Sequence, residues 1–296
     1  MKNASKLYSE KNPIRVQFRD ISGWPDIDAY WIRFLKKYGR PVVQVDRDPD
    51  LILYSMFGMY KSRPTKYFFK NKARVVFFTG ENSKPDKYAD FNLTYEHSSD
   101  FSNERWPLWA MGPHDPNSQM KQEKKTEFCS FVYSHKIKFR NQLCKDISEY
   151  KKVNCGGGCL NNVGYKVKDK EAFQKSHKFD ISCENSQTPG YVTEKIFNAY
   201  HSNCIPIYFG SNKIEEDFNP ETFINAHKFS SRKDLIDYIK EVDHNDALYQ
   251  SYFNKPIFSE KWRNIFKDEG QSFYERVCER ICPSSLFPFE TNIKIK

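Results

Sequence analysis

The first third of the chain alternates between strand-like and helix-like spacing of apolar residues. Residues 26–38 repeat apolar side chains at the i, i+3, i+4 spacing of an amphipathic helix, and Gly39 follows as a C-cap glycine would. Short apolar runs, typical of strands, occupy residues 14–18, 41–45, 51–57 and 74–78. Because the run from Val75 to Phe78 is continuously apolar, it predicts a strand covered on both faces. This order of elements predicts an α/β unit built on a parallel sheet.

The pattern stops at a polar stretch and then restarts. Residues 113–127 contain prolines, polar residues and charges of both signs without apolar periodicity, which predicts a linker. Strands are expected after it at residues 128–133, 179–183, 205–209 and 223–227, and helices at 139–150, 192–201 and 231–241. We therefore expect two α/β domains, residues 1–120 and 121–296, with the last helix packing back on the first domain. Ligands of such sheets bind at the carboxyl ends of the strands.

Composition limits the class of protein. The 296 residues fit two domains of roughly 150 residues, and 39% hydrophobic with 16% aromatic residues excludes overall disorder. No apolar run approaches the ~20 residues of a membrane-spanning helix. Residues 1–10 lack the apolar segment of a secretory signal, which indicates a cytoplasmic protein.

Charge leaves three kinds of partner open. The chain has 47 Lys and Arg against 38 Asp and Glu, a formal net charge of +9. This balance is compatible with nucleic acid, an anionic membrane surface, a phosphorylated small molecule, or a solvated lysine-rich surface. The basic residues are spread along the chain rather than clustered among aromatic residues, which argues against nucleic acid.

The eight cysteines offer little chemistry of their own. Most lie singly within apolar stretches, as small buried hydrophobes do. Two C-x3-C pairs, Cys155/Cys159 and Cys278/Cys282, leave zinc as a minor alternative, although structural zinc sites more often use tighter spacings. We expect no metal ligands.

Residues 179–229 carry the most specific pattern. They read as a strand, a polar loop from Glu184 to Tyr191, a helix and a second strand. The N–H groups and dipole of a helix N-terminus favour phosphate at such a position. Lys195 lies in the first turn of this helix, against the preference for acidic residues there, which indicates a bound anion. The alternative is a lysine that simply faces solvent.

The run CENSQTPGYVTEKIFNAYHSNCIPIYFG resembles the signature of the α1,3/4-fucosyltransferases of glycosyltransferase family 10, especially the compact bacterial members. Weaker resemblances cover FFTGEN at residues 77–82, FRN at 139–141 and the glycine-rich stretch at 156–166. Two features depart from the family pattern. Cys183 stands where the family usually has Phe, and Thr188, Pro189 and Gly190 alter the loop spacing.

The resemblance implies a GT-B fold, with two Rossmann-like domains facing each other across a cleft. It also implies inverting transfer of L-fucose from GDP-fucose to the 3-hydroxyl of an N-acetylglucosamine or glucose unit, in an oligosaccharide or glycolipid containing a β-galactoside. The product would be of Lewis type, and no metal or other cofactor would be obligatory. Basic surface residues suggest peripheral contact with an anionic membrane at its inner face. The alternatives are another sugar nucleotide, α1,4 linkage, or a nucleic-acid-binding protein.

The resemblance also assigns roles to residues on the acceptor side. Glu81 follows the strand at 74–78 and is the expected general base, with Glu96 as the rival carboxylate. Trp106 and Trp109 are expected either to stack on acceptor sugars or to belong to the core.

On the donor side, Arg140 and Lys195 would clamp the diphosphate, each from the first turn of a helix. Glu194 would accept hydrogen bonds from ribose or fucose hydroxyls, on a side of the helix about 100° from Lys195. Thr193 is expected to cap the helix. The nucleotide pocket would be lined by Asn185, Ser186 and Tyr191.

Overall fold

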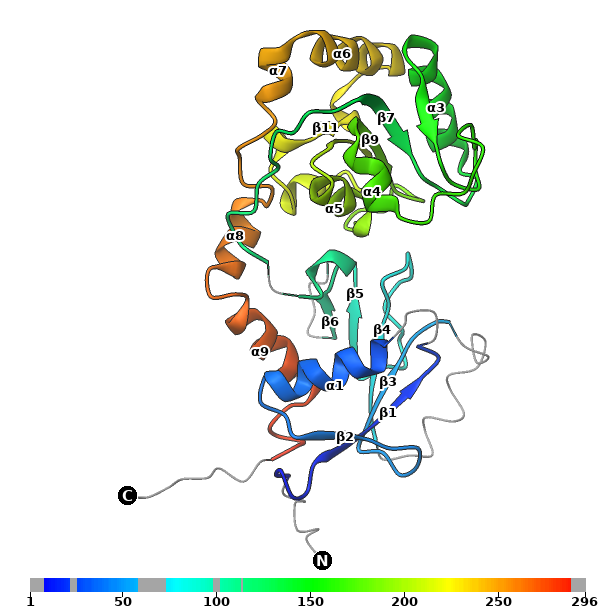
Figure 1. Ribbon diagram of the computed structural model, residues 1–296. Coiled ribbons are helices and arrows are strands. Elements are labelled where there is room, and N and C mark those ends of the chain that lie inside the picture. The colour runs from blue at the N-terminus through cyan, green and yellow to red at the C-terminus, as the bar shows by residue number, and fades with distance from the viewer. Residues whose placement is uncertain (1–7, 22–25, 58–72, 98–101, 113, 289–296) are drawn as a thin grey trace, which may run out of the picture. The chain divides into compact units, whose positions relative to one another are not determined.

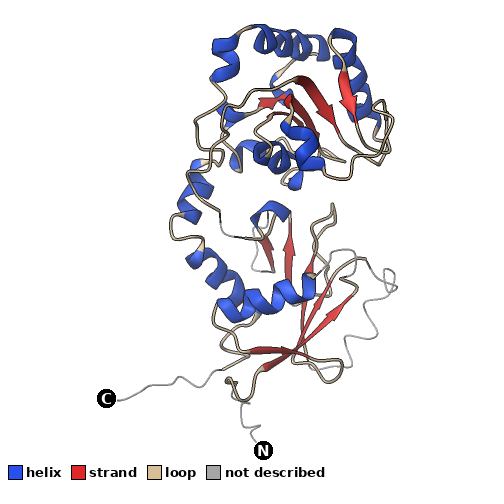
Figure 2. Ribbon diagram, viewed as in Figure 1, coloured by secondary structure: helices blue, strands red, loops and turns tan. Residues whose placement is uncertain are grey.

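The computed structural model describes residues 8–21, 26–57, 73–97, 102–112 and 114–288. It divides into two compact units (Figure 1). Unit 1 comprises Met1–Trp106 and Gly270–Lys296, and unit 2 comprises Pro107–Glu269. Figure 2 shows that each unit has its own sheet with helices around it.

Unit 1 contains a six-stranded sheet in which every neighbouring pair of strands is parallel. Its strands are β1 (Ile14–Arg19), β2 (Val42–Gln44), β3 (Leu51–Tyr54), β4 (Arg74–Phe78), β5 (Phe91–Thr94) and β6 (Asn103–Arg105). They are ordered β2-β1-β3-β4-β5-β6. The interior strands β3 and β5 are buried along their whole length, as strands covered on both faces should be.

Two helices from opposite ends of the sequence share the core of unit 1. Helix α1 (Ile27–Lys37) ends as its sequence predicts, because Gly39 takes a left-handed φ of 91° just beyond the helix. Helix α9 (Gln271–Ile281) packs against it, with the rings of Phe34 and Tyr274 5.8 Å apart. Trp106 stacks on Phe273 at 5.7 Å. The aromatic side chains of both helices therefore contribute to one core.

Unit 2 contains a five-stranded parallel sheet ordered β11-β10-β9-β7-β8. The strands are β7 (Glu127–Phe131), β8 (Val153–Cys155), β9 (His177–Cys183), β10 (Ile205–Phe209) and β11 (Ile224–Asn225). The helices are α3 (Lys138–Tyr150), α4 (Lys170–Lys175), α5 (Glu194–His201), α6 (Arg232–His244), α7 (Asp246–Gln250) and α8 (Glu260–Phe266). Both units therefore confirm the α/β class expected from the sequence.

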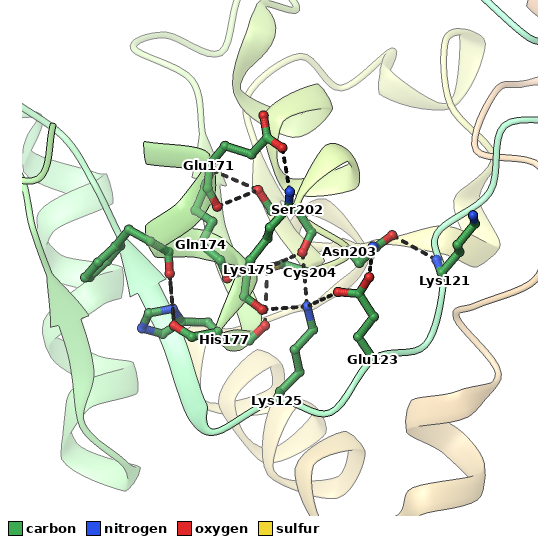
Figure 3. A network of polar contacts seen from close by, with 12 residues as sticks. Lys121, Glu123, Lys125, Glu171, Gln174, Lys175, His177, Ser202, Asn203 and Cys204 are labelled. Carbon is green, nitrogen blue, oxygen red and sulfur yellow. Dashed lines mark hydrogen bonds and ion pairs between the residues drawn. The ribbon is translucent and has the colours of Figure 1, made fainter. Parts of the chain in front are cut away.

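The boundary between the units lies at residues 106 and 107 rather than at the expected 120 and 121. The stretch expected to be a linker is fastened to unit 2 (Figure 3). Lys125 Nζ donates hydrogen bonds to the carbonyls of Lys175 and Ser202, at 2.8 and 3.0 Å. Asn203 Nδ2 donates to Glu123. The polar composition of residues 113–127 resembles that of a free linker because the partners, two backbone carbonyls and the Asn203 side chain, lie far away in the sequence.

The cysteines are all buried and free of disulfides. Within the described residues no three His, Cys, Asp or Glu side chains gather as a metal site would require. The same part of the chain contains no helix long and apolar enough to span a bilayer.

Candidate functional site

The polar loop between β9 and α5 is closed by a buried carboxylate at its start. Glu184 follows the last residue of β9 and has no exposed surface. Its Oε1 accepts a hydrogen bond from the backbone N–H of Thr193 at 2.7 Å, and the Thr193 hydroxyl lies 2.8 Å from Oε2. Burial raises the pKa of Glu184, although Lys195 and Thr193 act in the opposite direction. The two ends of the loop are thus tied together at the carboxyl edge of the sheet.

Lys195 is held inside this arrangement instead of facing solvent. Its side chain is only 11% exposed, and its Nζ lies 3.1 Å from Glu184 Oε2 and 2.7 Å from the Thr193 hydroxyl. Burial by itself lowers the pKa of Lys195, but the Glu184 and Glu194 carboxylates outweigh it and the net pKa is raised. Lys195 is therefore a cation at physiological pH.

Two details differ from the sequence-based expectation. Thr193 occupies the N-cap position of α5, but its hydroxyl makes no cap hydrogen bond because Glu184 engages it. Glu194 and Lys195, expected on divergent sides of the helix, approach to 3.5 Å. Both side chains are long enough to bend toward each other at the helix start. Lys195 also gives Glu194 a net lowered pKa, against the effect of burial.

Arg140 lies beneath the same loop, in the first turn of α3 as predicted. It is buried, and its Nη1 donates hydrogen bonds to Asn185 Oδ1 at 2.9 Å and to the Cys183 carbonyl at 3.3 Å. Its Nη2 donates to the His135 carbonyl at 2.8 Å. The Arg140 charge opposes protonation of Lys195. The structure thus gathers both predicted cations at one edge of the unit 2 sheet.

Tyr133 forms the platform for Arg140. The Arg140 guanidinium carbon lies 3.6 Å from the centre of the Tyr133 ring, a cation–π contact. The Tyr133 hydroxyl donates to the Ile181 carbonyl at 2.6 Å and accepts from the Cys183 N–H at 3.0 Å. Tyr133 therefore fixes Arg140 to the end of β9. No sequence pattern marked Tyr133 for this role, because tyrosines after strands are usually plain core residues.

The other predicted donor-side residues lie within the loop, in different environments. Asn185 is exposed, and Tyr191 is buried. Ser186 is partly buried, with its hydroxyl 3.1 Å from that of Thr188. Gly190 adopts a left-handed φ of 84° and donates its N–H to Ser211 Oγ. The loop is therefore anchored at Gly190 as well as at its two ends.

The two candidate bases lie in unit 1 and have similar surroundings. Glu81 follows β4 and Glu96 follows β5, and these strands are neighbours. The N–H of each donates to a buried threonine hydroxyl two residues earlier, Thr79 for Glu81 and Thr94 for Glu96. Because the strands are parallel, both carboxylates lie at the carboxyl edge of the sheet. Position alone does not distinguish the base from its rival.

The two tryptophans are core residues, which confirms one of the two expectations and corrects their alternative assignment to acceptor sugars. Trp106 has 0% exposure within the aromatic core of unit 1. Trp109 has 4% exposure in unit 2, where its ring lies 4.6 Å from that of Trp262 and 5.0 Å from that of Phe218. A ring covered on both faces offers no surface to a sugar.

The unit 2 site can bind an anion. Two cations, Arg140 and Lys195, come from the first turns of two helices, where N–H groups and helix dipoles also favour negative charge. Sequence reasoning missed Glu184 and Tyr133, which hold the two cations. Glu184 was visible only as one of many polar residues in a loop.

Comparisons with known proteins identify the family of the chain. The model of the glycosyltransferase family 10 (fucosyltransferase) C-terminal domain matches residues 121–284. The model of the alpha-(1,3)-fucosyltransferase FucT N-terminal domain matches residues 16–112.

Named relatives cover the chain in part. The alpha-(1,3)-fucosyltransferase FucT of Helicobacter pylori is 30% identical over 260 residues, which is 74% of this chain and 54% of the relative. The 4-galactosyl-N-acetylglucosaminide 3-alpha-L-fucosyltransferase 9 of Mus musculus is 34% identical over 144 residues, which is 47% of this chain and 36% of the relative. The chain thus spans about half, or less, of the length of these curated relatives.

Solved structures extend the likeness over nearly the whole chain. A crystal structure of an alpha1,3-fucosyltransferase with GDP-fucose superposes with a TM-score of 0.70 at 26% identity, covering 94% of this chain and 93% of the other. This likeness confirms the GT-B fold class, with its two Rossmann-like domains. With the family model matching more than half of its residues, the chain belongs to glycosyltransferase family 10, the fucosyltransferases.

Proposed function

We propose that this protein transfers L-fucose from GDP-fucose, with inversion, to the 3-hydroxyl of an N-acetylglucosamine or glucose unit in a β-galactoside-containing glycan. One observation carries the proposal: the buried side chains of Arg140 and Lys195 converge on the loop between β9 and α5 of unit 2. A solved member of the same family carries GDP-fucose.

The charges of the site suit a nucleoside diphosphate sugar. Arg140 can donate to a diphosphate in bidentate fashion, and Lys195 supplies a point charge. Glu194 is largely exposed at the helix start, with 51% of its side chain accessible, so it is available to accept hydrogen bonds from sugar hydroxyls. Asn185 shares its amide with Arg140 and is exposed on its other side. We assign these four residues to the donor, with Ser186, Thr193 and Tyr191 shaping the loop.

Inversion requires a single in-line displacement at the fucosyl carbon. A base removes the proton of the acceptor hydroxyl as the bond to the GDP oxygen breaks, and the cations stabilise the leaving diphosphate. We propose Glu81 as this base. Its carboxylate follows a strand of the unit 1 sheet, and it belongs to the segment that resembles the family's acceptor-side motif.

The base is tested by comparing Glu81→Gln with Glu96→Gln. Removal of a general base typically costs about 10²–10⁴-fold in rate. We expect that loss in Glu81→Gln, with GDP affinity unchanged, and a much smaller loss in Glu96→Gln. The reverse ranking would transfer the role to Glu96.

The acceptor and the linkage are tested together. A panel of β-galactoside glycans is incubated with GDP-fucose, and the product is analysed by NMR for its anomeric configuration and linkage position. An α1,3-linked fucose on N-acetylglucosamine or glucose supports the proposal. An α1,4 linkage would favour the alternative specificity, and a β-linked product would exclude inversion.

Two further parts of the proposal concern conditions. We propose that no metal is needed, so turnover should persist in EDTA.

The net charge of +9 supports peripheral contact with an anionic membrane at its inner face. Cosedimentation with phosphatidylserine vesicles, compared with phosphatidylcholine vesicles at physiological salt, tests this contact. Equal recovery with both would exclude it.

A further inference from the structure

Glu184 is a fully buried carboxylate to which the proposed chemistry gives no task. We propose that Glu184 is a positioning residue whose negative charge keeps Lys195 protonated and aimed into the donor site. The proposal rests on the proposed function only in taking GDP as the probe of that site.

The contacts of Glu184 are specific rather than incidental. Its carboxylate receives the N–H and the hydroxyl of Thr193, and it forms an ion pair of 3.1 Å with Lys195. Lys195 in turn donates to the Thr193 hydroxyl at 2.7 Å. These contacts join a carboxylate at the end of β9 to the first turn of α5. Movement of Glu184 would therefore move the ammonium group.

Gly210 lacks a side chain at the point where Glu184 packs, and this leaves space for the Glu184 side chain. A Cβ on Gly210 would lie 2.6 Å from Glu184 Cγ and 2.7 Å from the Tyr208 hydroxyl oxygen. Residue 210, which follows β10, is thus the wall against which Glu184 packs. A carboxylate confined by backbone on one side and hydrogen-bonded on the other has a fixed position.

The electrostatic surroundings leave Lys195 dependent on Glu184. The only other nearby acid from the described residues is Glu194, which lies farther away, at 3.5 Å, and is half exposed. Arg140 opposes the Lys195 charge, and burial disfavours it as well. The other charged and titratable groups that act on this pair are Glu194 on α5, Arg140 on α3, Tyr133 after β7, Cys183 on β9 and Tyr208 on β10. Lys170 on α4 acts on Glu194.

The first experiment removes the negative charge of residue 184 and keeps the shape of its side chain. In Glu184→Gln the amide can still accept from the Thr193 N–H, but the counter-charge of Lys195 is lost. We expect the pKa of Lys195 to fall. GDP affinity is measured by calorimetry from about pH 7 to about pH 10. The loss of affinity with rising pH should begin at lower pH in Glu184→Gln than in the wild type. Above the lowered pKa of Lys195, affinity should fall by up to about tenfold per pH unit.

The matched control is Asp180→Asn, which removes a buried carboxylate within β9, the strand that Glu184 follows. Asp180 accepts hydrogen bonds from the Ser130 and Ser182 hydroxyls and has no ion pair with Lys195. Its pH profile for GDP affinity should match that of the wild type. An unchanged profile in Glu184→Gln, or the same shift in both variants, would overturn the proposal.

A second substitution isolates the protonation of residue 195. Arginine stays protonated throughout the accessible pH range. The double variant Glu184→Gln/Lys195→Arg should therefore bind GDP with little dependence on alkaline pH, whatever its absolute affinity. If its affinity falls at the same pH as in Glu184→Gln, another group titrates and the proposal is wrong.

A third variant covers the case in which Glu184→Gln folds poorly. An uncompensated buried charge destabilises a protein, whereas removing both partners often restores stability. Glu184→Gln/Lys195→Met should then recover the yield and denaturation midpoint lost in the single variant. A double variant as unstable as the single one would mean that Glu184 serves packing alone.

A direct measurement separates this proposal from the proposed function. The pH dependence of Lys195 acetylation by acetic anhydride, followed by peptide mass spectrometry, reports its pKa without substrate. A lower midpoint in Glu184→Gln supports the inference even if GDP-fucose is never turned over. An equal midpoint contradicts it even if the wild type proves to be a fucosyltransferase.

Discussion

Two adjacent glycines should respond in opposite directions to the same substitution. A Cβ on Gly157 would lie 2.1 Å from the carbonyl oxygen of Tyr133 and 2.5 Å from its nitrogen. A Cβ on Gly158 would meet nothing closer than the Ser134 Cα at 3.5 Å, an ordinary contact. Neither glycine has a positive φ, so steric space decides between them.

The expected magnitudes follow from these distances. In Gly157→Ala the backbone of Tyr133 must move by about 1 Å to restore van der Waals contact, and such overpacking costs about 1–3 kcal/mol. Gly158→Ala fits without strain and reduces the entropy of the unfolded chain, which stabilises by about 0.4–1 kcal/mol. The free energies of unfolding of the two variants should therefore differ by about 1.5–4 kcal/mol.

The assay is urea denaturation of wild type and both variants, with GDP titration on each folded protein. Because Tyr133 supports the Arg140 guanidinium at 3.6 Å, Gly157→Ala should also weaken GDP binding, and Gly158→Ala should not. Equal denaturation midpoints in the two variants would refute the steric argument. A destabilised Gly157→Ala with wild-type GDP affinity would refute the coupling between Tyr133 and the site.

Further predictions concern Arg140 and an acidic residue far from the loop. Arg140→Lys keeps the charge but loses the fork that binds Asn185, and GDP-fucose turnover should fall by about 10²–10³-fold; near wild-type kinetics would contradict the clamp. Burial raises the pKa of Asp243, but hydrogen bonds from Lys178 and Lys151 outweigh it and the net pKa is lowered. Asp243 therefore stabilises the fold above the unfolded pKa of about 3.9, and this contribution disappears as pH falls through the folded value. Asp243→Asn should cost about 1–3 kcal/mol at neutral pH, and urea midpoints should show the difference from wild type shrinking in acid; a constant difference would exclude the linkage.

Local pattern was enough to predict most of the larger elements. The amphipathic spacing before Gly39 identified α1, and the continuous apolar run of β4 identified a buried strand. The strands β5, β6 and β8 went unrecognised, since their sequences FNLT, NER and VNC mix polar and apolar residues and contain no continuous apolar run. Helix α9 was expected only as an unplaced last helix. Its apolar face contacts residues more than two hundred positions earlier, and no local pattern records such a contact.

The residues of the candidate site likewise fall into those that local pattern predicts and those that depend on distant contacts. Arg140 and Lys195 were recognisable because each stands in the first turn of a helix within a family-like motif. Glu184 and Tyr133 act through distant partners, and the sequence does not show which polar or aromatic side chain will be buried beneath a cation. For Trp109 the sequence left open whether the ring stacks on a sugar or belongs to the core, and its burial against Trp262 decides for the core.

The central claim is that this protein uses GDP-fucose. The most direct test measures GDP or UDP release from GDP-fucose, GDP-mannose and UDP-glucose, each with an N-acetyllactosamine acceptor, in wild type and Lys195→Ala. The account predicts acceptor-dependent release from GDP-fucose alone, reduced by about 10²–10³-fold in Lys195→Ala. Faster release from another sugar nucleotide, or undiminished release in Lys195→Ala, would contradict it.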